Sequence, residues 1–587
     1  MGRLHRSSLI LLRQSGFPTC NLPVEFRYNL DSHRVEFDQG EQLTSAMVWK
    51  GLRLPLVTGM VLALAALEGC NVIVGLNNLT EQALPSDAGA SAETCTSNQA
   101  CTSSATLAAS GGPTDASTLD AQGTVPSVCV HSTGTCAPLL SDDCLTVTGD
   151  YLNDRAIVVG SLFAVRGATA TQNIPRQQSA AMAIEEINLV GGIPTSAAGN
   201  SRPLVMVSCD TSANLLQAAS HLVDDLHVPA IVGPNTSQDT LDVSNNVTIK
   251  AGTVVMSPTA VAAGIADLID KDLTWLMIPS DKQRGQLMIR QINDLEDMLK
   301  LNRPASNVKL SIIYRNDALG IGTRTSLDSL VINGKTLVDP LNAGSTSGRV
   351  QIDFYDPKQP NYGALVSKQV TFAPDIVVLA GTAETVTSIM TPLEQQWATG
   401  SPRPYYLLID PSKGPELLAL VTGNDDLRLR VRGTGTTSGP DSGPVFNAFN
   451  LDFLVRYGSS PTASGTGPSY DATYAIAYAL AASKDLPISG ANVASGLRRL
   501  AGGTAKVTTG SQDLLTAFQT LDSGANIAAW GTFCPLDWDA DGAVKGGTIE
   551  MWCVGLAGTT PVFRSSGLSF DIMTQSFHGA YTQCGSS

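Results

Sequence analysis

The sequence has little charge, few aromatic side chains and few histidines. Charged residues make up 15% of the 587 residues, aromatic residues 5%, and there are six histidines. The formal net charge is −15, which leaves no basic stripe to neutralise phosphates, so we expect no nucleic-acid partner. Hydrophobic residues still account for 43% of the chain, enough to bury the cores of two or three domains.

The common catalytic and phosphate-binding motifs are also missing. The sequence contains no Gly-x-Ser-x-Gly, no His-Glu-x-x-His and no Gly-x-x-x-x-Gly-Lys. Its histidines precede the expected core, lie on or after a surface-type helix, or lie near the end of the chain. We therefore predict no catalytic residues, no enzymatic activity, no cofactor and no metal site.

One apolar run of 14 residues, 54–67, follows Lys50 and Arg53 and ends in Leu67-Glu68-Gly69-Cys70. A membrane-spanning helix would need about 20 apolar residues. The segment resembles a bacterial lipoprotein signal peptide, although Glu68 is unusual there. We predict a signal peptide at 47–70, a lipid on Cys70 and a protein exported to the cell envelope, facing the periplasm or the outer surface. Ordinary cleavage near Cys70 is the alternative.

The 46 residues before Met47 have no apolar or amphipathic organisation. Because signal peptides begin a chain, Met47 is the expected initiator and 1–46 an upstream extension assigned in error. A genuine cytoplasmic extension is the alternative.

Residues 71–150 are rich in Ser, Thr, Ala, Gly and Asp, and contain few large apolar residues. Such a segment cannot fold by packing alone, so we predict a low-complexity tether. Its five cysteines favour disulfides in an exported protein, and their odd number implies a partner in the folded region, Cys209 or another. Zinc is the alternative, but no CxxC spacing is present and only one histidine is near. The five are Cys95, Cys101, Cys129, Cys136 and Cys144.

Strand-like and helix-like segments alternate after residue 150. Apolar runs predict strands at 155–162, 202–210, around Ile231 and around Val254, with helices at 177–189, 215–226 and 240–250 between them. A second series has a helix at 285–299 and strands at 308–314, 375–380 and 405–410. Helices follow at 447–457 and 472–482, then a strand pair within 533–553. This alternation predicts an α/β fold with two doubly wound, mostly parallel sheets.

Two of these strands end in hydroxyl-bearing turns. The segment 229–237 ends at Ser237, and the segment 252–259 ends in Ser257-Pro-Thr259. Ligands of open α/β sheets bind beyond the carboxyl ends of the strands, so Ser237, Ser257 and Thr259 are candidate ligand-binding residues. Capping of the following helices by Ser237 and Thr259 is the alternative.

Several short motifs in this order resemble the type I periplasmic ligand-binding family, which includes the leucine/isoleucine/valine-binding proteins and receptor ligand-binding regions. They are Ala183-Ile-Glu-Glu-Ile-Asn188, Val207-Ser-Cys-Asp210, Ile231-Val-Gly-Pro234, Met256-Ser-Pro-Thr259, Pro279-Ser-Asp281 and Ser469-Tyr-Asp-Ala-Thr473. The resemblance covers about 155–563. It implies a Venus-flytrap of two lobes joined by a hinge that the chain crosses three times. Lobe one is expected at 151–278 and 433–522, lobe two at 279–432 and 523–565, and a C-terminal tail at 566–587.

The resemblance also implies a ligand site. The Ser237 hydroxyl would hold a ligand carboxylate, the Thr259 carbonyl would meet the ligand, and Asp410 would receive an ammonium group. The lobe-two loops add four candidates, Asn316, Asp317, Thr382 and Glu384. Two positions depart from the family: Val261 replaces a threonine and Leu319 an aromatic residue. If Asp410 is the only charge in the cleft, an amine-bearing ligand is favoured, because an unpaired buried carboxylate is costly. A neutral polar ligand is the competitor.

The segment Asp537-Trp-Asp-Ala-Asp-Gly542 resembles the start of a calcium loop. The twelfth position should be acidic but is Thr548, so a turn between two strands is the preferred interpretation. Cys534 and Cys553 flank this turn and are a candidate disulfide.

These features predict a lipid-anchored solute-binding protein that closes on a small polar ligand, an amino acid or a related compound. The resemblance implies delivery to an ABC-type permease. The alternative is an envelope sensor or interaction protein with the same two lobes and no transport role.

Overall fold

The computed structural model describes the backbone of residues 25–29 and 34–38, and residues 95–103, 124–130, 133–195, 200–304, 306–343, 348–439, 442–461 and 463–585. The chain divides into two units, Met1–Ser91 and Ala92–Ser587. In the first unit, β1 (Glu25–Asn29) pairs antiparallel with β2 (Arg34–Asp38). The signal peptide predicted at 47–70 and its Cys70 lie outside the described residues. In the described parts of the chain, no helix is both long and apolar enough to cross a membrane.

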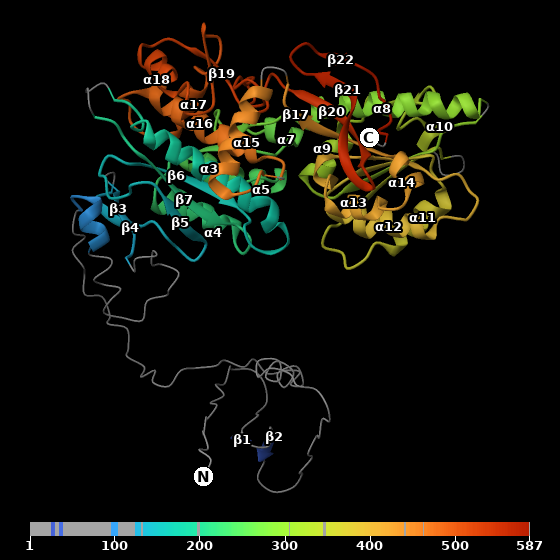
Figure 1. The fold of residues 1–587 in the computed structure, drawn as a ribbon, viewed down its shortest axis with the longest axis horizontal. Helices are drawn as coiled ribbons and strands as arrows, with labels where there is room; N and C mark the ends of the chain where they lie inside the picture. The colour runs from blue at the N-terminus through green and yellow to red at the C-terminus, as the bar shows by residue number, and fades with distance from the viewer. Residues whose placement is uncertain are drawn as a thin grey trace. The chain divides into compact units, whose positions relative to one another are not determined.

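The second unit contains a six-stranded sheet, which with its helices forms lobe one (Figure 1). All its strands are parallel except β5, which pairs antiparallel with β7 at the edge. The order is β10 (Thr274–Leu276), β9 (Val254–Ser257), β8 (Ala230–Val232), β6 (Ile157–Phe163), β7 (Leu204–Asp210) and β5 (Cys144–Thr148). This confirms the predicted parallel βαβ series.

Lobe two is built on an eight-stranded sheet. Its first five strands are parallel, and the last three continue the sheet antiparallel. The order is β14 (Val350–Tyr355), β11 (Leu310–Arg315), β15 (Ile376–Ala380), β16 (Tyr405–Leu408), β17 (Val431–Thr437), β20 (Thr548–Ala557), β21 (Thr560–Asp571) and β22 (Ser576–His578).

Alternate strand residues face opposite sides of each sheet, and helices bury both sides. In lobe one, Met206 and Val232 pack with α3 and α16, while Val207 and Ile231 pack under α4. Because both faces are covered, these strands are apolar throughout. Lobe one contains α3 (Ala170–Leu189), α4 (Leu215–Ser220), α5 (Ser237–Val243), α6 (Ile249–Ala251), α7 (Ala263–Ala266), α15 (Gly443–Tyr457), α16 (Thr466–Ser483), α17 (Gly490–Leu497) and α18 (Leu514–Asp522). Lobe two contains α8 (Asp281–Asn302), α9 (Ala318–Thr325), α10 (Pro340–Ala343), α11 (Gly363–Phe372), α12 (Thr391–Gln396), α13 (Pro415–Val421) and α14 (Asp425–Arg430).

The chain crosses between the two sheets three times, as predicted. The crossings follow β10, β17 and β19 (Ile527–Trp530). They bond to one another: the Ser438 hydroxyl donates to the Thr532 carbonyl at 2.7 Å, and the Cys534 thiol donates to the Met277 carbonyl at 3.6 Å. The three crossings therefore form one connected hinge.

Sheet membership corrects two expected lobe boundaries. Residues 433–437 were expected in lobe one, but they belong to β17, which pairs with β16 of lobe two. Residues 523–544 were expected in lobe two, yet β19 pairs with β18 (Ala505–Thr508), and Trp538 and Val544 join the lobe-one core. The expected tail also differs, because β21 and β22 extend the lobe-two sheet to His578. In all three cases, pairing with a strand that is distant in the sequence determines the lobe to which the segment belongs.

The predicted tether is folded where the structure describes it. Strands β3 (Ser127–Val130) and β4 (Thr135–Pro138) pair antiparallel, and β5 joins the lobe-one sheet. The disulfides are Cys95–Cys129, Cys101–Cys136 and Cys144–Cys209. The prediction of disulfides with one partner in the folded region is thus confirmed, and that partner is Cys209. The zinc alternative is wrong because these sulfurs bond to one another. The cross-links add to a small apolar cluster in which Val128, Val130 and Leu139 pack against lobe one.

The expected Cys534–Cys553 disulfide is wrong. Cys553 on β20 bonds to Cys584 near the end of the chain. Cys534 is free and buried in the lobe-one core, and burial raises the pKa of its thiol. Residues 539–542 do form the expected turn, in which the Asp539 amide donates to the Ala543 carbonyl. That turn does not join two long strands, however, because β20 pairs with β17 and β21.

Removal of the Cys144–Cys209 disulfide should destabilise the protein. The two cysteines are 65 residues apart, and loop-closure entropy predicts a loss of about 4 kcal/mol in the free energy of unfolding. Equilibrium urea denaturation of a Cys144→Ala/Cys209→Ala variant measures this loss. Cys534→Ala, which removes a buried thiol without opening a cross-link, is the control. Equal losses in the two variants would contradict the prediction.

Candidate functional site

The hydroxyl of Ser237 fixes the loop that follows β9. Ser237 is the first residue of α5, and its Oγ accepts hydrogen bonds from the amides of Val261 at 3.1 Å and Ala262 at 3.2 Å. The capping alternative is wrong for Ser237, because Thr236 caps α5 by accepting from the Asp239 amide. Ser237 therefore connects the ends of β8 and β9.

The other two hydroxyls bind the loop after β8. The Ser257 hydroxyl donates to the Pro234 carbonyl, and the Thr259 hydroxyl donates to the Asn235 carbonyl, both at 2.5 Å. The structure therefore brings Ser237, Ser257 and Thr259 together at two adjacent strand ends, as the sequence predicted. Each hydroxyl also has a structural role, and the role of Thr259 is not that of a helix cap.

These strand-end loops contact lobe two. The carbonyl of Val261 accepts from the Asp281 amide at 2.7 Å, where α8 begins. The side-chain carbonyl of Gln238 accepts from the Ala318 amide at 3.3 Å, where α9 begins. We call this region the inter-lobe contact. It consists of loop 258–262, the first turns of α5, α8 and α9, and the adjoining strand-end residues Arg315 and Asp410.

Three of the lobe-two candidates gather around Arg315, the last residue of β11. Its Nε lies 2.5 Å from Asp317, and its Nη1 lies 3.1 Å from Glu384 and 3.2 Å from the Thr382 hydroxyl. Burial alone would raise the pKa of Glu384, but hydrogen bonds from Thr382 and Tyr355 and the charge of Arg315 lower it. The fourth candidate, Asn316, is exposed beside this group.

Asp410 has charged neighbours. It begins a single turn after β16, and its Oδ2 accepts from the Thr436 amide at 3.2 Å. Its Oδ1 lies 3.6 Å from Nη2 of Arg284, and Nη1 of Arg284 lies 3.2 Å from Oδ1 of Asp281. The premise that Asp410 is the only charge in the cleft is therefore wrong. Asp281 and Arg284 on α8 share its environment.

The hinge depends on Asp471 of α16. This buried carboxylate accepts from the Thr532 amide at 2.8 Å, the Thr532 hydroxyl at 2.6 Å and the Thr509 hydroxyl at 2.7 Å. Burial raises the pKa of Asp471 to about 6, although these three hydrogen bonds oppose the rise. Thr532 lies in the third crossing, so Asp471 anchors the hinge to the lobe-one core.

Solved structures share this two-lobed architecture. The branched-chain amino acid transporter substrate-binding protein LivJ from Streptococcus pneumoniae, in complex with isoleucine, is 16% identical and has a TM-score of 0.51. The match covers 70% of this chain and 99% of LivJ. The fold is that of the type I periplasmic binding proteins.

Two further solved structures also match. The leucine-binding protein LivK from Thermotoga maritima is 15% identical, with 70% of this chain and 97% of LivK covered and a TM-score of 0.48. A substrate-binding protein from Desulfitobacterium hafniense in complex with Leu is 18% identical, with 70% and 100% covered and a TM-score of 0.47. No known family matches by its sequence profile, and no curated protein matches by sequence.

Sequence reasoning missed the cations of this periplasmic binding fold. Arg315 directly precedes the predicted Asn316 and Asp317, and buried acids need a compensating charge. Asp281 lies in a motif that marked the resemblance, and Arg284 follows it by one helical turn. The sequence therefore carried both signals: an arginine directly before two polar candidates, and an arginine one helical turn after an aspartate.

Arg176 of α3 is another missed cation, on the lobe-one side. Its Nε donates to the Ser464 carbonyl at 2.7 Å and its Nη1 to the Asn173 amide oxygen at 2.6 Å. Burial lowers the pKa of Arg176 to about 10, and within the described chain no acidic side chain pairs with it. Gly465 lies between the side chains of Arg176 and Thr259, because a Cβ on Gly465 would contact both of them. Lobe one thus buries an uncompensated positive charge beside a candidate ligand residue.

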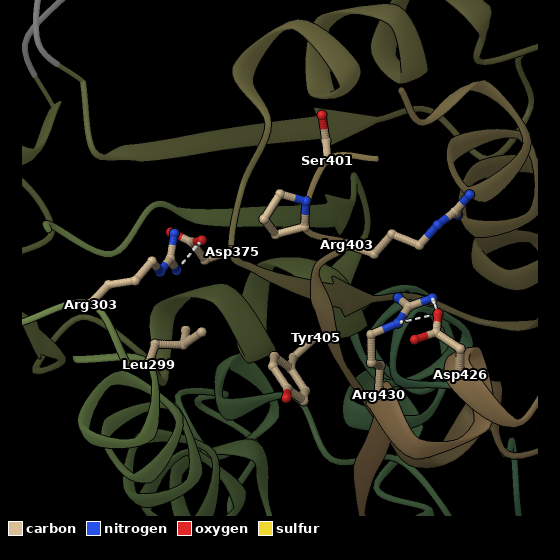
Figure 2. A pocket seen from close by; sticks show the side chains of 9 residues that line it. Leu299, Arg303, Asp375, Ser401, Arg403, Tyr405, Asp426 and Arg430 are labelled. Carbon is tan, nitrogen blue, oxygen red and sulfur yellow. Dashed lines mark hydrogen bonds and ion pairs between the residues drawn. The ribbon is translucent and has the colours of Figure 1, made fainter. Parts of the chain in front are cut away.

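A cavity of about 530 Å³ lies at the opposite end of the lobe-two sheet (Figure 2). Asp375 and Tyr405 stand at the amino ends of β15 and β16, whereas ligands of such sheets bind beyond the carboxyl ends. Its guanidinium groups are already paired: Arg303 with Asp375, Arg403 with Glu394, and Arg430 with Glu394 and Asp426. We therefore place the candidate site at the inter-lobe contact.

Substitution of Ser237 by alanine should destabilise the fold. It leaves the buried amides of Val261 and Ala262 without their acceptor, at a cost of about 1–3 kcal/mol in the free energy of unfolding. Urea denaturation measures the change. Ser306→Ala, the same substitution at an exposed position of lobe two, is the matched control and should change stability by less than about 0.5 kcal/mol. Similar values for both variants would contradict the role assigned to Ser237.

Asp471 should make stability depend on pH. Its folded-state pKa of about 6 lies above its ordinary value of 3.8, so its stabilising contribution is complete below pH 3.8 and is lost as the pH rises through 6. Relative to Asp471→Asn, the natural protein should lose roughly 2 kcal/mol between pH 4 and 6.5. Urea denaturation at a series of pH values measures this difference. Parallel stability profiles would show that Asp471 does not titrate in this range.

Proposed function

We propose that this chain is an extracytoplasmic solute-binding protein that captures a small polar ligand between its two lobes. The observation that carries the proposal is the inter-lobe contact. There, the carboxyl ends of two parallel sheets bring together the hydroxyls of lobe one and the charged groups around Arg315 and Asp410 of lobe two. A small number of polar groups that converge where two lobes meet is typical of small-molecule binding sites.

Capture would work by a shift between open and closed lobes. In the structure the lobes touch through the hydrogen bond from the Ala318 amide to the Gln238 side chain. Gln238 is exposed there, and closure of the lobes would cover it. A ligand that contacts both lobes binds the closed state better and so increases its population. The connected hinge limits the motion to the three crossings.

The class of ligand is proposed from the neighbours. LivJ was solved with isoleucine and the Desulfitobacterium hafniense protein with Leu. We propose an amino acid or a related polar compound as ligand, and an ABC-type permease as the partner that receives it. A lipid on Cys70 would hold the protein at a membrane of the cell envelope.

A ligand screen by thermal denaturation tests this proposal. The full chain is required, because a fragment that starts at residue 145 would leave Cys209 without its disulfide partner. We expect at least one compound among the amino acids, their amides and small peptides to raise the melting temperature. A ligand at 100 times its Kd stabilises a protein by about 2.7 kcal/mol.

Two variants locate the site. Asp410→Asn at the inter-lobe contact should reduce the ligand-induced shift, while Arg303→Gln in the distant cavity should leave it unchanged. If only Arg303→Gln reduced the shift, the ligand would bind in the distant cavity instead. If no compound changed the melting temperature, the solute-binding function would be wrong.

A further inference from the structure

The cavity at the amino ends of the lobe-two strands (Figure 2) has unused hydrogen-bond donors. The side chain of Arg303 is bonded only through Nη2, to Asp375, and that of Arg403 only through Nη1, to Glu394. Within the described chain, the other nitrogens of both guanidinium groups and the Tyr405 hydroxyl have no hydrogen-bond partner. The ion pairs therefore fix the two arginines and still leave donors for a ligand.

The two carboxylates that line the cavity are already in use. Asp375 accepts hydrogen bonds from Arg303 at 2.5 Å and from the Lys309 amide at 2.9 Å. Asp426 accepts from Nε and Nη2 of Arg430 at 3.0 and 2.8 Å. The unused groups are thus mainly donors, and they suit a ligand that is rich in acceptors.

A buried arginine beside Tyr405 adds positive charge to this region. The guanidinium of Arg432 lies 5.2 Å from the ring centre of Tyr405 and 4.1 Å from that of Tyr581. Arg432 is 4% exposed, and within the described chain its Nε has no hydrogen-bond partner and no carboxylate forms an ion pair with it. A buried charge without a partner is costly, so an anion nearby would stabilise it.

The charges around the cavity give the sign of the ligand. Four guanidinium groups meet three carboxylates, which leaves one positive charge in excess. The guanidinium groups are those of Arg303, Arg403, Arg430 and Arg432, and the carboxylates are those of Asp375, Glu394 and Asp426. Both the free donors and the excess charge favour an anion.

We propose that this cavity is a second ligand site, which binds the oxyanion of a small organic acid, either a carboxylate or a phosphate ester. Its volume of about 530 Å³ lies within the range of small-molecule sites. Guanidinium groups form strong, charge-assisted hydrogen bonds to both kinds of oxyanion. Arg303 and Arg403 would supply these bonds, and the Tyr405 hydroxyl would donate a further one.

The second site does not depend on lobe closure. Every residue that lines the cavity belongs to lobe two, and the cavity lies at the opposite end of the sheet from the inter-lobe contact. The inference therefore goes beyond the proposed solute-binding function and does not rest on it.

Matched acid and neutral probes test the inference by titration calorimetry on the full chain. Succinate is compared with succinamide, and glycerol 3-phosphate with glycerol, at constant ionic strength. We expect at least one acid to bind about 10-fold more tightly than its neutral counterpart, because hydrogen bonds to charged groups are the stronger ones. Preference for succinate would identify a carboxylate ligand, and preference for glycerol 3-phosphate a phosphate ester.

Three variants locate the bound acid. Arg303→Gln should weaken its binding about 10-fold. Tyr405→Phe keeps the ring beside Arg432 and removes only the hydroxyl, and it should weaken binding about 5-fold. Arg290→Gln is the matched control, because Arg290 of α8 also forms one ion pair, with Asp294, but does not line the cavity.

The outcomes separate this inference from the proposed function. If neither acid is preferred over its neutral counterpart, or if Arg303→Gln and Arg290→Gln weaken binding equally, the second site is overturned. Asp410→Asn should leave the affinity for the acid unchanged. If it abolished binding of the acid, the cavity assignment would be wrong while solute binding at the inter-lobe contact would stand. If the acid binds as expected and the amino-acid screen fails, the proposed function fails and the second site stands.

Discussion

The hydrogen bonds that Thr532 and Thr509 donate to the buried carboxylate of Asp471 anchor the hinge between the two lobes to the core of lobe one. Thr532 belongs to the third chain crossing and accepts a further hydrogen bond from Ser438 of the second. The first crossing joins through Cys534 and Met277. The crossings consequently join the two sheets so that the carboxyl ends of strands from both lobes meet beside the hinge, where the Val261 carbonyl accepts from the Asp281 amide.

The two lobes contribute different chemistry to the inter-lobe contact. Lobe one presents hydroxyls that are already committed to the backbone, and it buries Arg176 without an acidic partner in the described chain. Lobe two presents acids in excess over guanidinium groups, with Asp281 and Asp410 around Arg284 and with Asp317 and Glu384 around Arg315. The two lobes therefore bring charges of opposite sign to this contact.

Disulfides extend the type I periplasmic binding fold at both ends of the second unit. Cys144–Cys209 fastens β5 to the edge of the lobe-one sheet, and Cys553–Cys584 fastens the end of the chain to lobe two. The side chain of Asn98 adds hydrogen bonds to the Tyr151 and Asn153 carbonyls. Residues before lobe one are thus part of the folded unit where they are described, so the expected tether is shorter than its composition suggested.

The sequence by itself determined the α/β class, the two series of parallel strands and the strand ends at Ser237 and Thr259, because continuous apolar runs and hydroxyl turns are local signals. It also indicated that the cysteines before lobe one form disulfides and that one of them pairs with a cysteine of the folded region, while the structure identified that partner as Cys209. Tertiary structure alone decided the disulfide partner of Cys553, the lobes to which β17 and β19 belong, and the charged neighbours of Asp410. These depend on residues far apart in the chain, such as Arg284 and Asp410, which packing brings within 3.6 Å. Local patterns report burial and turns, whereas charge compensation is set only when distant segments meet.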